Sequence, residues 1–595
     1  MKHYVFSRLL QLIPILFVIT FLSFAMMRLA GSDVVLQSME RTGMAASDAV
    51  VAAARAELGL DKPFLTQYFT WLGKLLQGDM GRSYVSGRPV FETFIAKLPA
   101  TLLLTGVSVG LTLLVSLPLG VFSAVNQNRW GDWVIRSLSF VGNSIPNFFA
   151  ALLLLYIFAI QLQWLPVISR QLTVESVILP ASTLALAMSA KYIRQVRATV
   201  LDELSKDYVL AARARGIPFA ATLIFSVLRS SLVTIITLLM LSIGSLLGGT
   251  AIVESIFMWD GVGKLAVDAI NMRDYPMIQA YVMWMAIIYV CVNLMTDLSY
   301  PADSFGEGSL MTAQIIMPAA VQRRRKVRQR WGFYAIAALA ALVCLTALFS
   351  EWIAPYDPNA QIFASLSPPS WEHWAGTDRY GRDLFSRILV GLRTSISATL
   401  SLVFIIMTTG TIVGMICGYR GGYVDTIMMR ISDVCLAFPG LVFALAIAAL
   451  LNGGLINAVF ALAAISWPKY ARIARSQTLR LKDSDFLAAA KMSGATTAAQ
   501  IWRHILPNAM GPILVTAMLD IGTMMMELAG LSFLGLGAQP PTAELGNMMS
   551  GGRSMLQTYP WVILAPGAAI LFAVVAFNLL GDAVRDRLDP KNTQR

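Results

Sequence analysis

Residues 191–216 read KYIRQVRATVLDELSKDYVLAARARG, and residues 469–494 read KYARIARSQTLRLKDSDFLAAAKMSG. The two stretches align without a gap at a constant offset of 278 residues (469 − 191). Lys, Tyr, two Arg, Leu, Asp, two Ala and Gly coincide at matching positions. Solenoid units recur every 20 to 50 residues or so, and a repeat this widely spaced instead indicates two copies of a half-protein in one chain.

Each copy predicts a short helix with a termination signal at its C-terminal end. The Ala-rich segments favour slim helices, and we expect Asp207 and Asp485 to N-cap them. Gly216 and Gly494 suit the left-handed position just past a helix end. An ordinary amphipathic loop would explain one copy alone. Two copies in one register, each between membrane-length apolar runs, indicate a pair of surfaces that another protein binds.

The composition is typical of a polytopic membrane protein. The 595 residues are 56% hydrophobic and 13% charged, with a mean hydropathy of +0.65, whereas soluble domains are roughly 45–50% apolar and about 25% charged. The net charge of +12 comes from short basic segments beside apolar runs. We therefore expect these segments to face anionic membrane lipid on the cytoplasmic side, and we expect no nucleic-acid partner.

Hydropathy predicts about six spans in each half, twelve in all. The first is an uncleaved span that ends near residue 28, with its N-terminus in the cytoplasm. Basic segments alternate with less basic ones as the positive-inside rule requires, which places both termini in the cytoplasm. The other predicted spans lie near residues 99–125, 133–162, 174–193, 230–253, 277–298, 331–349, 395–418, 434–451, 456–471, 508–530 and 561–581.

The repeated segments resemble the EAA loops of ATP-binding-cassette (ABC) importer permeases, which dock on ATPase subunits. The motif's glutamate position holds Leu210 in one copy and Ala488 in the other, and its proline is Arg229 in the first copy but Pro507 in the second. The residues that match the motif are Ala211, Ala212 and Gly216, then Ala489, Ala490 and Gly494, with His504, Ile505, Leu506, Pro507 and Asn508 at its downstream end.

Three further stretches resemble the dipeptide/oligopeptide branch of this family. GDMGRSYVSGRPVFETFIAKLPATLLLT, residues 78–105, resembles its first permease subunit. WAGTDRYGRDLFSRILVGLRTSI, residues 374–396, and ELAGLSFLGLGAQPPTAELGNMMSGGR, residues 527–553, resemble its second subunit. The resemblance therefore implies two permease subunits fused in one chain, in the bacterial cytoplasmic (inner) membrane.

The resemblance implies an all-α polytopic membrane protein with two homologous six-span halves in the MetI-like type I fold. Two ABC ATPase subunits or domains, which bind ATP and Mg²⁺, would drive it, and an extracytoplasmic solute-binding protein would deliver the substrate. The family carries dipeptides, oligopeptides, nickel chelates and glutathione, and we expect peptides. The expected ATPase-docking residues are Asp207, Ala211, Ala212, Gly216, Asp485, Ala489, Ala490 and Gly494.

We divide the chain accordingly. The first permease half spans residues 1–298, with a polar extracytoplasmic loop at 31–97 and a cytoplasmic coupling segment at 205–229. A basic cytoplasmic linker spans 299–330. The second half spans 331–595, with its coupling segment at 483–507. The Gly-rich stretches 254–276 and 527–553 are candidates for the outer gate or the surface that meets the delivery protein, because irregular backbone at membrane depth must be buried or line a cavity.

The sequence encodes no energy source of its own. Gly261-Val262-Gly263-Lys264 lacks the Ser/Thr that completes a phosphate-binding loop. The three histidines are scattered, and no Ser-His-Asp arrangement is visible. We therefore expect no enzyme, no catalytic residue, and no cofactor or metal in this chain, and its pore-lining residues stay undefined. The alternative is a proton-coupled twelve-span secondary carrier, which would usually need ionisable groups inside its spans.

Overall fold

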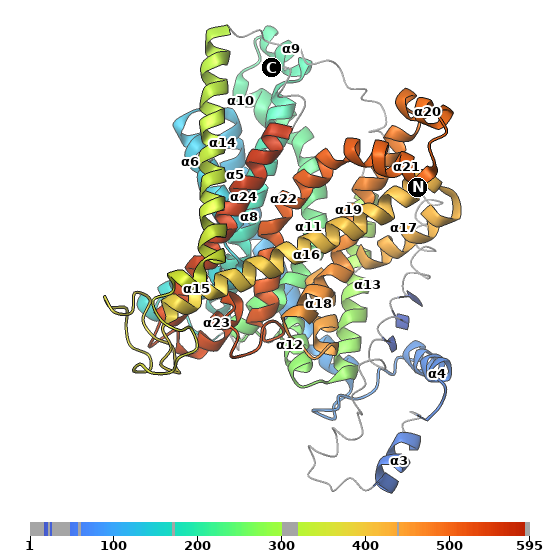
Figure 1. Ribbon diagram of the computed structural model, residues 1–595, viewed down its shortest axis with the longest axis vertical. Helices are drawn as coiled ribbons and strands as arrows, with labels where there is room; N and C mark the ends of the chain where they lie inside the picture. Colours follow the sequence, from blue (N-terminus) through green and yellow to red (C-terminus); the bar gives the residue numbers. More distant parts are fainter. Residues whose placement is uncertain are drawn as a thin grey trace.

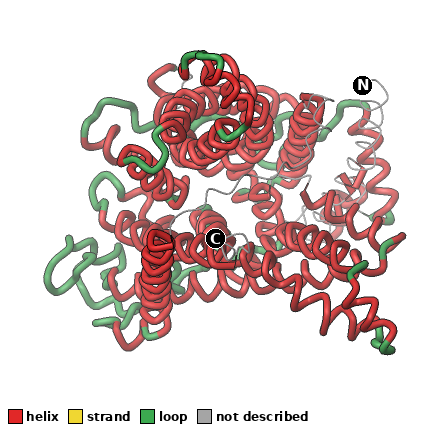
Figure 2. Tube along the Cα trace, turned by 90° about the horizontal axis from the view of Figure 1, so that it is seen from above, coloured by secondary structure: helices red, strands yellow, loops and turns green. Residues whose placement is uncertain are grey.

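Helices account for most of the described residues in a computed structural model (Figure 1). The structure describes residues 48–57, 61–168, 173–299, 319–436 and 440–588, with a few positions between 17 and 25. Within these ranges it contains no strand, only two isolated bridges, and Figure 2 shows helices across the whole cross-section. The expected all-α fold is therefore confirmed.

The first half runs from α3 to α13. Within it, the short helices α9, α10 and η2 connect the long helix α8 to the long helix α11. Its helices are α3 (Asp48–Glu57), α4 (Phe64–Leu76), α5 (Val90–Val125), α6 (Trp130–Ser144), α7 (Asn147–Leu154), the π-helix η1 (Leu155–Gln161), α8 (Val174–Leu204), α9 (Asp207–Ala214), α10 (Phe219–Thr222), the π-helix η2 (Leu223–Val227), α11 (Leu228–Phe257), α12 (Val262–Asn271) and α13 (Tyr275–Ser299).

The second half repeats this order from α16 to α24. It too has a π-helix, η3, directly before a long helix, α22, as η2 directly precedes α11 in the first half. Its helices are α14 (Ala319–Leu348), α15 (Ser350–Ile353), α16 (Leu384–Arg420), α17 (Gly422–Leu436), α18 (Gly440–Leu450), α19 (Leu455–Lys482), α20 (Asp485–Met492), α21 (Thr497–Ala499), the π-helix η3 (Gln500–Ile505), α22 (Leu506–Phe533), α23 (Leu545–Gly552), the 3₁₀-helix η4 (Arg553–Met555) and α24 (Trp561–Leu588).

Seven helices in the described ranges are long and apolar enough to cross a membrane, or nine if each of two bent pairs is one span. The predicted spans 133–162 and 434–451 correspond to these pairs, α6 with α7 and η1, and α17 with α18, which bend by 104° and 91°. Of the other predicted spans, the first lies largely outside the described residues. Another corresponds to the 17-residue apolar part of α14, Gly332–Leu348, and a third lies within the partly basic α19.

Two predicted boundaries differ from the helices. α5 begins at Val90, inside the expected extracytoplasmic loop 31–97, and α14 begins at Ala319, inside the expected linker 299–330. The basic run therefore continues into the apolar helix without a break. The rest of that linker lies outside the described residues, and the proposed division into halves stays a prediction.

Close packing of the first long helix on the fourth holds each half together. α5 packs along α8, and α16 packs along α19. A Cβ atom on Gly120 would lie 2.7 Å from the Cβ of Val196, and one on Gly414 would lie 2.8 Å from the Cβ of Ala474. Val196 and Ala474 are themselves 278 residues apart (474 − 196). Small residues let helix backbones approach closely in lipid, so the same close approach occurs once in each half.

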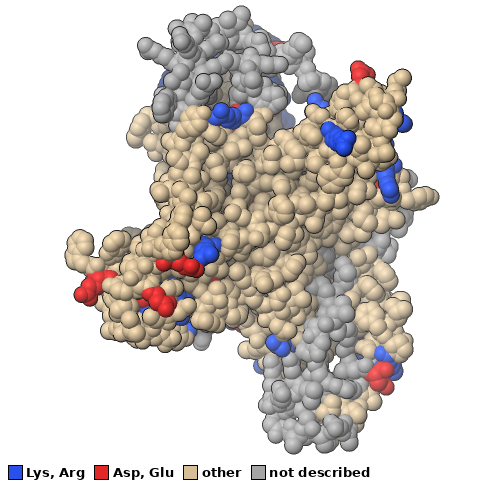
Figure 3. Space-filling view, in the orientation of Figure 1, with Lys and Arg blue, Asp and Glu red and all other residues tan. Residues whose placement is uncertain are grey.

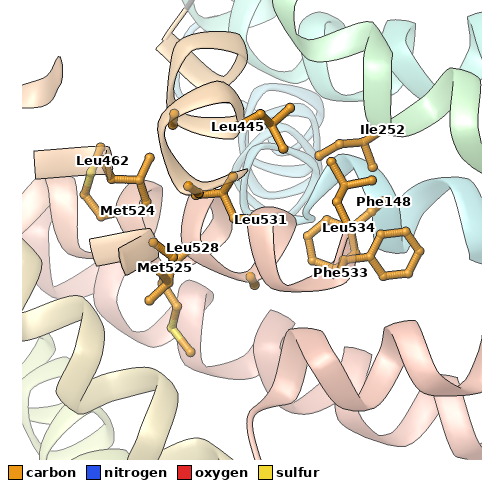
Figure 4. Packing of buried hydrophobic residues seen from close by; sticks show 14 of the residues in the cluster. Phe148, Ile252, Leu445, Leu462, Met524, Met525, Leu528, Leu531, Phe533 and Leu534 are labelled. Carbon is orange, nitrogen blue, oxygen red and sulfur yellow. The ribbon is translucent and has the colours of Figure 1, made fainter. Parts of the chain in front are cut away.

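The two halves meet in a continuous apolar core (Figure 4). Phe148 on α7 stacks on Phe533 on α22, with ring centroids 5.3 Å apart and an interplanar angle of 17°. Ile252 on α11 lies beside them, and Leu445 on α18 approaches from the second half (Figure 4). All four side chains are less than a tenth exposed. We call this contact, with Leu531 and Leu534, the central apolar contact.

Candidate functional site

The two coupling segments have the same backbone. A long helix, α8 or α19, ends two residues before an eight-residue helix, α9 or α20. The predicted N-caps are wrong by one residue: Lys206 and Ser484 are the N-caps, and neither caps through its side chain. Asp207 and Asp485 are instead the first helical residues. There their negative charge still interacts favourably with the helix dipole.

The C-terminal ends of both helices confirm the expected glycine role. Gly216 has a φ of +78° and Gly494 a φ of +80°. Each helix ends in a Schellman motif, in which two amides past the helix donate back to its last turn. These bonds run from Gly216 N to Arg213 O (2.9 Å), Ile217 N to Ala212 O (3.1 Å), Gly494 N to Lys491 O (3.0 Å) and Ala495 N to Ala490 O (3.1 Å).

Each short helix is anchored by one buried side chain. Val209 on α9 is 2% exposed and its counterpart Leu487 on α20 is 3% exposed. Val209 packs into a small cluster with side chains of α5, α8, η2 and α11. The expected docking residues lie around these anchors: Asp207, Gly216, Asp485, Ala489 and Gly494 are exposed, and Ala211, Ala212 and Ala490 are half-buried.

Large apolar side chains project from both short helices. Leu210 on α9 is 68% exposed, and Met492 on α20 is 90% exposed. Tyr208 and Phe486, which occupy matching positions, are 37% and 41% exposed. Burial and the Glu203 carboxylate raise the pKa of the Tyr208 hydroxyl, which donates to Glu203 Oε2 at 3.0 Å. Exposed apolar side chains of this kind are typical of surfaces that contact another protein or a membrane.

Both short helices lie at the same end of the molecule, α9 at the top and α20 at the upper right (Figure 1). Lys and Arg side chains gather over the described part of this end in Figure 3. The short helices α12 and α23 lie at the opposite end (Figure 1). The molecule therefore presents two equivalent basic surfaces with exposed apolar side chains on one face.

A second repeated contact, which no sequence pattern indicates, lies next to these surfaces. The guanidinium of Arg197 on α8 binds both oxygens of Asp132 on α6, at 2.7 and 2.9 Å. Arg475 on α19 binds both oxygens of Asp425 on α17 in the same way, at 2.5 and 2.6 Å. We call these the Asp–Arg pairs. The arginines coincide in the repeat, but the aspartates are 293 residues apart (425 − 132), so the 278-residue offset does not align them.

At the opposite end, a buried glutamate ties each Gly-rich stretch to the first long helix. Glu254, on α11, accepts from the Thr101 hydroxyl (2.8 Å) and from the amide of Lys264 on α12 (2.9 Å). In the second half the carboxylate is that of Glu544, which precedes α23 and accepts from Ser395, Gly546 and Asn547. Both carboxylates are fully buried. The same link is thus made from different positions along the chain.

We expect Glu544→Ala to destabilise this link. The substitution leaves two backbone amides and a hydroxyl without their acceptor in a buried place, a loss on the order of 3 kcal/mol. The midpoint of thermal unfolding in detergent should fall clearly, and less so for Glu544→Gln, which keeps one oxygen. Exposed Glu372 provides the control. If Glu544→Ala melts like Glu372→Ala, the carboxylate does not stabilise the link.

Comparisons with known proteins match both halves. The family described as binding-protein-dependent transport system inner membrane component matches residues 116–302 and 410–594, and its N-terminal companion matches residues 1–105. The probable D,D-dipeptide transport system permease protein DdpC of Escherichia coli strain K12 is 46% identical over 256 residues, 43% of this chain and 86% of that protein.

Two further relatives align over similar lengths. The dipeptide transport system permease protein DppC of Alkalihalophilus pseudofirmus is 45% identical over 260 residues, 44% of this chain and 83% of its own length. The glutathione transport system permease protein GsiD of Escherichia coli O6:K15:H31 is 44% identical over 269 residues, 45% of this chain and 89% of its own length. Each relative therefore corresponds to less than half of this chain.

Proposed function

The chain belongs to the family of binding-protein-dependent transport system inner membrane components, and on that premise we propose that it forms the whole transmembrane pathway of an ATP-driven importer. The family is one of ABC transport permeases and not of enzymes, and two family domains lie in this one chain. The proposal rests on one observation above all: the coupling segment occurs twice, with the same backbone, at one end of the molecule. Two equivalent ATPases need two equivalent docking sites.

The ATPase partners would bind α9 and α20. Each helix is held by a single buried anchor and leaves exposed apolar and basic side chains for a partner. The docking residues that we propose are Asp207, Ala211, Ala212 and Gly216 on one site, and Asp485, Ala489, Ala490 and Gly494 on the other. ATP and Mg²⁺ would be bound by these partners, and the chain itself would carry no cofactor.

For the substrate we propose di- or oligopeptides, or related small solutes such as glutathione. The relatives support this choice, since two are dipeptide transport permeases and one is a glutathione transport permease. An extracytoplasmic solute-binding protein would deliver the substrate at the end that carries α12 and α23. Both termini would be cytoplasmic, and α24 ends at Leu588 on the side of α9 (Figure 1). The family match favours an importer over the proton-coupled carrier.

Reconstitution tests the proposal. The chain is co-purified with its candidate ATPases, placed in liposomes, and assayed for ATP hydrolysis with and without a binding protein loaded with dialanine or glutathione. We expect stable association, hydrolysis stimulated by the loaded binding protein, and ATP-dependent uptake of one of the two solutes. Uptake driven by a proton gradient in the absence of any ATPase would instead establish the carrier.

A further inference from the structure

The Asp–Arg pairs connect two sets of helices. One set is α8 and α19, which lead into the proposed docking surfaces, and the other is the bent spans. Arg197 lies ten residues before α9 begins at Asp207, and Arg475 lies ten residues before α20 begins at Asp485. Only two residues separate α8 from α9, and α19 from α20. A displacement of either docking helix therefore acts directly on the helix that carries the arginine.

The aspartates lie on the bent spans that the arginines contact. Asp132 is on α6 and Asp425 is on α17, the first arms of the two bent pairs. The second arms are α7 and α18, which supply Phe148 and Leu445 to the central apolar contact between the halves (Figure 4). Each bent pair thus connects an Asp–Arg pair at one end to the meeting point of the halves at the other.

The geometry of each Asp–Arg pair restricts the relative movement of its two helices. Two parallel hydrogen bonds between a guanidinium and a carboxylate fix the relative orientation of the two groups, which a single bond does not. Asp132 is fully buried and also accepts from the Ser123 hydroxyl and, at 2.9 Å, from the Asn128 amide. The close approaches of Gly120 and Gly414 occur at the residues just before the two arginines, Val196 and Ala474. These contacts hold α5, α6 and α8 together, and the matching contacts hold α16, α17 and α19 together.

We propose that Arg197–Asp132 and Arg475–Asp425 are positioning contacts that transmit the displacement of α9 and α20 to α7 and α18, and so open the central apolar contact. The inference rests on the proposed docking of ATPases at α9 and α20. The argument for this role is position, since each pair lies between a proposed docking helix and the meeting point of the halves. Arg475 and Asp425 are also partly exposed, at 34% and 17% of their side chains, and an ion pair in contact with water adds little net stability.

Accessibility of the central contact tests this. The four native cysteines are replaced by alanine, and Leu534, 8% exposed at the central contact, is changed to cysteine. The chain is reconstituted with its ATPases and a dialanine-loaded binding protein, and a membrane-impermeant maleimide is added with and without ATP and vanadate. In this parent we expect nucleotide to increase labelling.

In the variant with Arg197→Gln and Arg475→Gln, ATP hydrolysis should persist while labelling no longer responds to nucleotide. Dialanine uptake per ATP hydrolysed should fall on the order of tenfold, within the usual range of coupling between sites. A matched control lies one turn away on α19: Arg472 binds Asp433 of α17 at 2.7 Å, but through one nitrogen and with side chains that are 50% and 39% exposed. Arg472→Gln should behave like the parent.

The outcomes separate the two proposals. If the parent itself shows no nucleotide response, the docking proposal fails. If the parent responds and the double glutamine variant responds equally, or if Arg472→Gln loses the response as well, the role of the Asp–Arg pairs is overturned. Should the glutamine variant not assemble, the double Arg→Lys variant, which keeps the charge without the two-bond fork, is read in the same assay. A full parental response there overturns the proposal too.

Discussion

Glutamate in place of both Gly216 and Gly494 is expected to abolish uptake while the chain inserts in the membrane at its normal level. Both glycines have positive φ, and a Cβ atom on either would meet nothing within 4 Å. The chain itself therefore has room for a side chain, and the left-handed backbone adds only about 1–2 kcal/mol of strain per site. A docked ATPase would instead meet a large charged side chain at a position where the chain has only a glycine.

Binding of the ATPases should weaken on the order of thirtyfold or more at each site, because disrupting a central interface contact costs about 2 kcal/mol or more. Co-purification and ATP-driven uptake measure this. Gly78 supplies the control, since it also has a positive φ and open space, but lies between α4 and α5 outside the coupling segments. Gly78→Glu should retain uptake. Wild-type uptake in the double variant, or equal loss in Gly78→Glu, would remove α9 and α20 as docking sites.

The second large effect is expected at the central apolar contact. Phe533 is 3% exposed and stacks on Phe148. Truncation of a buried phenylalanine to alanine costs about 3–5 kcal/mol, and here the lost contact is one that joins the two halves. Phe533→Ala should therefore shift the resting molecule toward separated halves and raise ATP hydrolysis in the absence of binding protein.

The measurement is hydrolysis with and without loaded binding protein in liposomes, where we expect the stimulation to shrink because the unstimulated rate rises. Phe572→Ala on α24 is the control, because that ring is 53% exposed and its loss leaves the contact between the halves intact. If Phe533→Ala lowers the thermal midpoint but keeps full dependence on binding protein, the contact stabilises the fold without controlling opening.

Local sequence patterns predicted the features that depend on neighbouring residues. The 278-residue repeat predicted two equivalent halves, and Gly216 and Gly494 predicted the left-handed helix ends that the structure contains. Apolar runs located the long helices. These features depend on helix propensity, on the steric freedom of glycine and on transfer of apolar side chains into lipid, each of which acts over a few turns of one segment.

Only the tertiary structure revealed the contacts between segments. Asp132 and Asp425 differ by 293 residues while their arginine partners differ by 278, so the connection between them is 15 residues longer in the first half (293 − 278). Glu254, on α11, and Glu544, just before α23, reach equivalent places from different parts of their halves. A side chain meets its partner through the packing of whole helices, and connections of unequal length change the spacing in sequence without changing that packing. The repeat therefore determined the two halves and their short helices α9 and α20, whereas helix packing decided which charges pair and where the halves meet.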